Sequence, residues 1–166
     1  MPIIVMMTIP TSRVGAMSLL NRVAAALLLA YGAPIGAVEV SGIKSGAELA
    51  RAVTAQVATI DSATLQREIA QNPELVLIDV RLPGEIMAQG GQIKATQNVN
   101  IPRGWLEFRV MRHTPSKDTP IVVYCGGNIR SVLAAHTLQQ MGYTQVRNYV
   151  DGFLGWKAQN LPIDPP

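Results

Sequence analysis

The chain has 166 residues, 48% hydrophobic and 15% charged, a composition typical of one globular domain with an added apolar segment. Its net charge is +3, but beyond residue 37 it carries 12 basic and 11 acidic residues, so its surface should be almost neutral. No basic cluster is present, and we therefore expect no nucleic-acid partner. One cysteine and two separated histidines exclude an internal disulfide and do not supply the ligands of a structural zinc site, so we predict no metal site.

The N-terminal region has the pattern of an export signal. Sixteen uncharged residues, 23–38, follow Arg22, and small residues end the stretch. This pattern predicts a secretory signal peptide over residues 1–37 and a location in the bacterial periplasm, with no membrane span left after cleavage. Met17 would give a leader of more usual length and is an alternative start. The other interpretation is an uncleaved membrane anchor that leaves the domain facing the periplasm.

Helices and strands alternate along the rest of the chain. Residues 38–60 are expected to form a linker with one short helix, "SGAELARAVTAQV", and a folded domain is expected over residues 61–166. The elements predicted in that domain are a helix capped by Asp61 or Ser62, a buried strand over 75–80, a loop with one helical turn over 81–91, a strand over 98–101, a helix over 103–111, a buried strand over 120–124, a helix over 131–141, a strand over 145–150 and a helix over 152–160. This order predicts an α/β fold with a central, mainly parallel sheet and helices on both faces.

Two groups of side chains are expected in the core. Three residues of the helix over 131–141 share one face, namely Ala134, Leu138 and Met141. Four aromatic residues are further core candidates, namely Trp105, Phe108, Phe153 and Trp156. Trp105 has a second interpretation, in which it lines the mouth of a pocket.

The single cysteine stands in "YCGGNIRS", between a predicted strand and a predicted helix. Ligands of open α/β sheets bind at the carboxyl ends of the strands, which is where Cys125 falls. A helix N-terminus favours a thiolate over a thiol, and the thiolate is the nucleophilic form. Cys125 is therefore the candidate catalytic residue. The structural alternative is a small side chain buried at a strand end.

The residues after the cysteine suit a loop that binds an anion. Gly126 and Gly127 permit φ angles that are closed to other residues, and Asn128 tolerates the left-handed region. No proline interrupts the loop, so its backbone N–H groups are available to form a cradle with the helix N-terminus. The predicted cradle residues are Gly126, Gly127, Asn128, Ile129, Arg130 and Ser131. For Arg130 an alternative is a structural ion pair that holds the loop.

Four segments, in order, resemble the rhodanese or sulfurtransferase family, in its single-domain, exported type. They are "LIDVRLPGEI", "GGQIKATQNVNIPRG", "VVYCGGNIRSVLAAHTLQQMGY" and "NYVDGFLGW". The first carries the family's D-V-R-x-P-x-E pattern on Asp79, Arg81 and Glu85, which we interpret as supporting residues that orient neighbouring loops. The third carries its C-x4-R-S loop, and the last its closing glycine and tryptophan segment.

The resemblance implies a sulfurtransferase. Its catalytic cysteine, Cys125 here, would take a sulfane sulfur from a donor such as thiosulfate or a persulfide. The sulfur would be held as a covalent persulfide, with no separate cofactor, and passed to cyanide, a small thiol or a protein thiol.

The chain departs from the family pattern at several positions. Gln92 replaces a histidine, Asn128 replaces a glycine, and Gly126 and Gly127 replace basic or polar side chains. The loop should therefore carry less positive charge, which favours a larger or less charged donor than thiosulfate.

Three other interpretations use the same residues. Cysteine-dependent phosphatases and arsenate reductases resemble C-x5-R, whereas only four residues separate Cys125 and Arg130. A non-catalytic binding module of the same fold typically lacks the cysteine that this chain keeps. A Cys–His pair is the third, but His136 falls opposite the buried face of its helix, and His113 lies in a polar turn.

Overall fold

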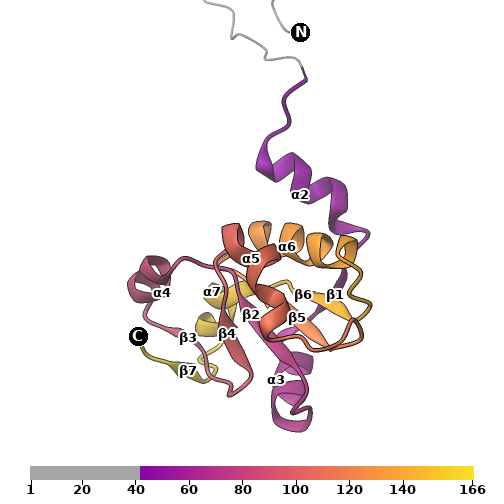
Figure 1. The fold of residues 1–166 in the computed structure, drawn as a ribbon. Coiled ribbons are helices and arrows are strands. Elements are labelled where there is room, and N and C mark those ends of the chain that lie inside the picture. Colours follow the sequence, from indigo (N-terminus) through magenta and orange to yellow (C-terminus); the bar gives the residue numbers. More distant parts are fainter. Residues whose placement is uncertain (1–41) are drawn as a thin grey trace, which may run out of the picture. The chain divides into compact units, whose positions relative to one another are not determined.

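The structure is a computed structural model and describes residues 42–166. Five parallel strands form the central sheet of this region (Figure 1). The sheet order is β1-β6-β5-β2-β4, and every neighbouring pair is parallel. In that order the strands span Ala58–Ile60, Val146–Tyr149, Ile121–Tyr124, Val76–Asp79 and Asn98–Asn100. The carboxyl ends of all five strands therefore meet at one edge of the sheet.

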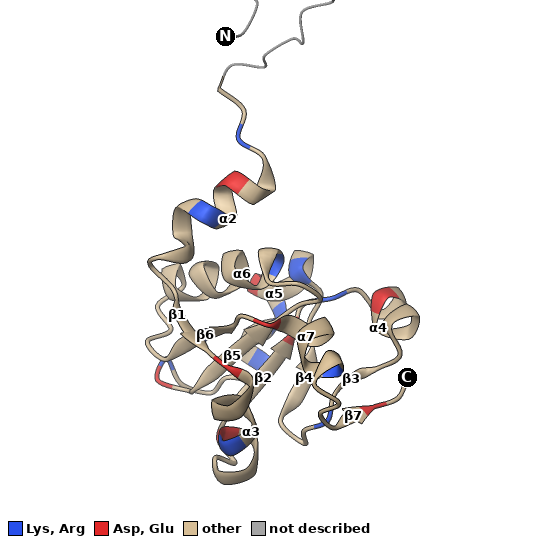
Figure 2. Cartoon of the chain, turned by 180° about the vertical axis from the view of Figure 1, so that it is seen from behind, with Lys and Arg blue, Asp and Glu red and all other residues tan. Residues whose placement is uncertain are grey.

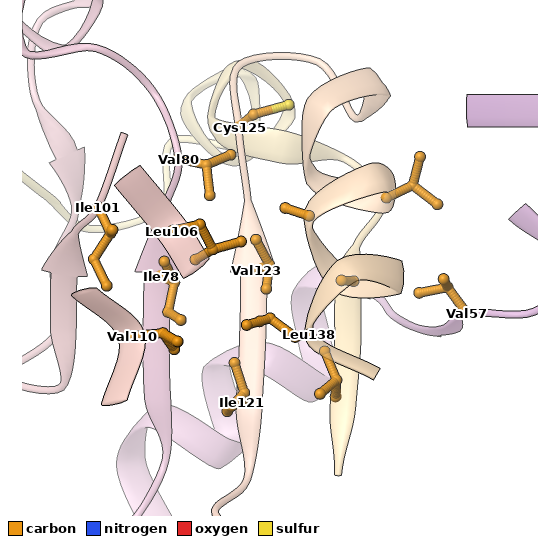
Figure 3. Close-up of a cluster of buried hydrophobic side chains, with 14 of the residues drawn as sticks. Val57, Ile78, Val80, Ile101, Leu106, Val110, Ile121, Val123, Cys125 and Leu138 are labelled. Atoms are coloured by element: carbon orange, nitrogen blue, oxygen red, sulfur yellow. The ribbon is translucent and has the colours of Figure 1, made fainter. Parts of the chain in front are cut away.

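Helices cover both faces of this sheet. One face carries α2 (Gly46–Thr54), α5 (Leu106–Arg109) and α6 (Ile129–Gln140), and the other carries α3 (Ser62–Gln71) and α7 (Gly152–Ala158). The side chains of β5 alternate between the two apolar clusters, and all four are fully buried. Figure 3 shows the cluster on the α6 face, with β2 and β5 packed against the helices. The predicted α/β fold, with a central parallel sheet and helices on both faces, is confirmed.

The predicted leader, residues 1–37, and its alternative start lie outside the described residues. Within residues 42–166, no helix combines the length and the apolar character that a membrane span requires.

The predicted linker contains more structure than its sequence pattern indicates. Its short helix is confirmed as α2, which begins with a reciprocal cap between Ser45 and Glu48 and packs against α6. Ala50 and Val57 belong to the buried core. Residues 58–60, expected in the linker, instead form the edge strand β1. Three residues with one buried side chain are too few to show an alternating pattern.

Other elements differ in length or were not expected. The segment over 81–91 holds a two-turn helix, α4 (Pro83–Gln89), in place of one helical turn. Near the end of the chain, β7 (Ile163–Asp164) pairs antiparallel with β3 (Gln92–Ile93). The predicted helix over 103–111 is divided into η1 (Arg103–Trp105), α5 and η2 (Val110–Arg112). Strands as short as β3 and β7, with two residues each, depend on tertiary contacts that a local sequence pattern does not show.

The predicted core is correct for some side chains and wrong for others. Phe153 and Trp156 are fully buried, but Trp105 and Phe108 are 52% and 76% exposed. The short helical segment that carries the exposed pair turns its aliphatic side chains inward instead. Met141 is 39% exposed because α6 ends before it.

Candidate active site

Cys125 lies at the point where β5 ends, at the carboxyl edge of the sheet, as predicted. Its side chain points from the strand toward the first turn of α6 (Figure 3), and the sulfur lies 3.5 Å from the hydroxyl of Ser131. The residue is only 1% exposed. Ser131 is also buried, and its hydroxyl donates to the carbonyl of Asn128 at 3.2 Å. The sulfur therefore sits beneath the loop, within reach of the amino end of a helix.

The backbone of the loop is oriented by the first turn of α7. The N–H groups of Phe153 and Leu154 donate to the carbonyls of Cys125 and Gly126, at 2.8 and 3.2 Å. The carbonyl and N–H of a trans peptide point in opposite directions, so the N–H groups of Gly126 and Gly127 point away from α7. Neither N–H has a hydrogen-bond partner in the part of the chain that the structure describes. Both are available to an anion.

Gly152 allows α7 to approach the loop this closely. A Cβ atom at this position would lie 2.7 Å from the carbonyl oxygen of Gly126 and 2.8 Å from that of Cys125. Its φ of 61° is also in the left-handed region that favours glycine. The sequence places this glycine at the start of the last helix, but its contact with the cysteine loop appears only in the fold.

Asn128, rather than a glycine, makes the sharp turn in the loop. It has φ 76°, whereas Gly126 and Gly127 are outside the positive-φ region. The two glycines therefore do not adopt the unusual φ angles that they permit, whereas Asn128 does adopt the left-handed conformation that it was expected to tolerate. The side-chain oxygen of Asn128 accepts from the amide of Asn148 at 2.6 Å, which holds the turn against β6. An asparagine can do both because it tolerates this conformation and also offers an acceptor.

Arg130 makes an ion pair on the outside of the loop. Because α6 begins at Ile129, earlier than the predicted Ser131, Arg130 lies in its first turn. Its guanidinium donates twice to the carboxylate of Glu85 in α4, at 2.6 Å each. This contact lowers the pKa of Glu85 to about 2 and raises the pKa of Arg130. The geometry corresponds to the ion-pair alternative, with Glu85 as the partner.

Asp79 and Arg81 form a buried support behind the site. Both are fully buried, and Arg81 donates to the two carboxylate oxygens of Asp79. Arg81 also donates to the side chain of Gln89 and to the carbonyl of Gly91, and its guanidinium lies 4.0 Å from the ring centre of Phe153. The pair thus connects β2, α4 and α7, as the loop-orienting interpretation predicts.

Sequence reasoning did not identify three residues at this site. Gly152 holds the loop against α7, and Asn148 binds the turn residue. The third, Gln89, accepts from Arg81 and lies beside Gly126, where an added Cβ would be 3.3 Å from its amide nitrogen. Asn148 and Gly152 stand in the segment "NYVDGFLGW", and Gln89 lies between two of the quoted segments, but their contacts with the cysteine loop appear only in the fold. Neither His113 nor His136, the two candidates for a Cys–His pair, forms a hydrogen bond with Cys125 in residues 42–166.

Comparison with known proteins identifies the family. The sequence model of the rhodanese-like domain matches residues 62–159, more than half of the chain. The chain belongs to the rhodanese-like domain family. This match confirms the resemblance to the rhodanese family that the four motifs indicated. The helix α2 and the strand β1 lie before the matched residues.

Relatives of this rhodanese-like domain include sulfurtransferases. A sulfurtransferase from Allochromatium vinosum is 37% identical over 107 residues, which are 64% of this chain and 94% of the relative. The thiosulfate sulfurtransferase PspE from Escherichia coli is 34% identical over 71 residues, 43% of this chain and 64% of that protein. A solved structure from Rhodopseudomonas palustris, of unknown function and a possible tyrosine phosphatase by name, has 28% identity and a TM-score of 0.63 over 73% of this chain and 95% of its own.

Proposed function

We propose that this rhodanese-like domain is a sulfurtransferase that carries a sulfane sulfur as a persulfide on Cys125. The observation that supports this most is the loop geometry, in which α7 holds the carbonyls of Cys125 and Gly126 and leaves the next two N–H groups unpaired. These N–H groups can stabilise a negatively charged terminal sulfur. The sulfurtransferase relatives give independent support.

The proposed reaction has two transfers and no net redox change. The Cys125 thiolate attacks the sulfane sulfur of the donor, a new S–S bond forms, and the donor's own bond to that sulfur breaks. Its electron pair leaves with sulfite when thiosulfate is the donor, or with a thiolate when an organic persulfide is. A thiol or cyanide then attacks the terminal sulfur, and the Cys125 thiolate is restored. No step needs a histidine base or a metal.

The donor that we favour is an organic persulfide. The loop side chains between Cys125 and Arg130 carry no charge, and Arg130 itself is already paired with Glu85. A doubly charged thiosulfate would therefore meet backbone dipoles but few free cations in the loop. The thiosulfate sulfurtransferase among the relatives makes thiosulfate the second candidate donor.

Intact-mass measurement tests the proposal directly. Cys125 is the only cysteine, so a mass increase of one sulfur atom after exposure to a donor can be assigned to it. We expect this increase with glutathione persulfide or thiosulfate, its loss on addition of cyanide with formation of thiocyanate, and no increase in Cys125→Ser. Hydrolysis of p-nitrophenyl phosphate without sulfur transfer would instead favour the phosphatase. The absence of both reactions would favour a binding module.

We also propose that the protein is exported to the periplasm. The support is the sequence pattern of residues 1–37. N-terminal sequencing of the mature protein from a periplasmic extract should begin near Val38. An intact leader in the membrane fraction would favour the anchored form.

A further inference from the structure

A cavity of about 290 Å³ lies beside the cysteine loop, between α2 and the start of α6. Arg51 and Thr54 of α2 line one side of it. Gly127, Asn128 and Ile129 of the loop line the other. Cys125 does not line the cavity, so a molecule that occupies it must extend from there toward the sulfur.

Arg51 brings a positive charge to this cavity. The helix α2 has Glu48 in its first turn and Arg51 in its last turn, and Figure 2 colours both types of charge on this helix. Glu48 is engaged by Ser45 at the helix start. Arg51 is exposed, and its Nε donates only to the carbonyl of Ala47 in its own helix, at 3.3 Å. No carboxylate pairs with it within residues 42–166, so its two terminal nitrogens are free to bind an anion.

The opposite wall combines space with apolar surface. A Cβ at Gly127 would meet no atom within 4 Å, so the loop is open at that point. Ile129 is 54% exposed and offers an aliphatic surface. A small organic molecule with an anionic end and a short aliphatic segment would match both walls.

We infer that Arg51 is a positioning residue that binds the carboxylate of an organic persulfide donor. The inference rests on the proposed sulfurtransferase function and assigns a donor class to it. In thiosulfate the charge is on atoms next to the sulfane sulfur, whereas in a carboxylate-bearing persulfide several bonds separate the two. Of the two donors, only the carboxylate-bearing persulfide can place its anionic group in the cavity while its sulfur lies outside it. Arg51 lies outside residues 62–159, so this contact is contributed by a segment outside the family match.

Steady-state kinetics of Arg51→Gln test the inference. For glutathione persulfide we expect KM to rise about five- to tenfold with kcat unchanged, the effect of one hydrogen-bonded ionic contact partly in water. Arg51→Lys should stay within about twofold of the wild type, because it keeps the charge. With 2-hydroxyethyl persulfide, which has no carboxylate, Arg51→Gln should leave KM unchanged. Arg67→Gln removes the same charge from α3, on the other face of the sheet, and should match the wild type.

Several outcomes would overturn the inference. An unchanged KM for glutathione persulfide in Arg51→Gln would show that Arg51 does not bind the donor, while sulfurtransferase activity would stand. An equal rise in the KM of Arg51→Gln for both persulfides would indicate that the substitution disturbs the structure of α2. A rise in KM for thiosulfate alone would indicate that Arg51 binds an inorganic donor. If the wild type accepts sulfur from none of the three donors, the proposed function itself fails.

Discussion

The ion pair between Arg130 and Glu85 should make a measurable contribution to stability, and we predict that Glu85→Gln lowers the Tm by about 4–8 °C at pH 7. The pKa of Glu85 falls from 4.5 to about 2, and a complete shift of that size corresponds to about 3 kcal/mol. The side chain of Glu85 is 29% exposed and that of Arg130 is 41% exposed. Screening by water therefore reduces the contribution of the ion pair to about 1–2 kcal/mol. For a domain of this size, 1 kcal/mol changes Tm by about 4 °C.

The pH dependence of this effect has a definite sign. The folded pKa of Glu85 is below the unfolded value, so the stabilisation is fully present above about pH 4.5 and is lost as the pH falls toward 2. Thermal melts of the wild type and Glu85→Gln should therefore differ most at neutral pH and converge below pH 4.5. Taking the difference between the two proteins removes the contributions of the other carboxylates.

A double-mutant cycle with Arg130→Gln should give a coupling energy of about 1–2 kcal/mol at pH 7. Glu74→Gln is the matched control, since this exposed carboxylate has no ion pair within residues 42–166, and its Tm should stay close to that of the wild type. A Tm difference for Glu85→Gln that is the same at pH 3 and pH 7 would refute the reasoning. So would a coupling energy below about 0.3 kcal/mol.

Two further predictions concern the loop. Gly152→Ala places a Cβ 2.7–2.8 Å from the carbonyls of Cys125 and Gly126, so we expect sulfur transfer to fall at least tenfold and urea denaturation to show a loss of about 2–3 kcal/mol. Gly104→Ala, in open space, is its control, and wild-type activity in Gly152→Ala would contradict the role of α7. Asn128→Ala should be about 1 kcal/mol less stable than Asn128→Gly in the same assay, because φ is 76° there; equal stabilities would argue against a strained turn.

Much of the fold can be predicted from the sequence because its strong patterns are local. The buried strands β2 and β5 are short apolar runs, and α3 begins at the predicted cap, Asp61. The exposed positions of Trp105 and Phe108 could not be predicted, because the short segment around them is divided into three helical pieces. A helical period needs a longer run to assign its buried face.

The candidate site divides in the same way. Cys125 could be located from the strand, loop and helix that surround it in the sequence. The left-handed conformation of Asn128 could also be expected, since asparagine tolerates this region, but the sequence did not show that Gly126 and Gly127 would leave it to Asn128 alone. The proposed role of Arg51 could not be inferred from the sequence, because it depends on α2 packing beside α6.

The sequence by itself determined an α/β domain of the rhodanese-like family with its single thiol at the carboxyl end of a buried strand, since these features depend on neighbouring residues. Only the tertiary structure decided which groups surround that thiol. Glu85 reaches Arg130 across 45 positions, and α7 approaches the loop through Gly152. Parallel strands are joined by crossover connections, so the residues that meet at one sheet edge are distant in the chain and no local pattern encodes their contacts.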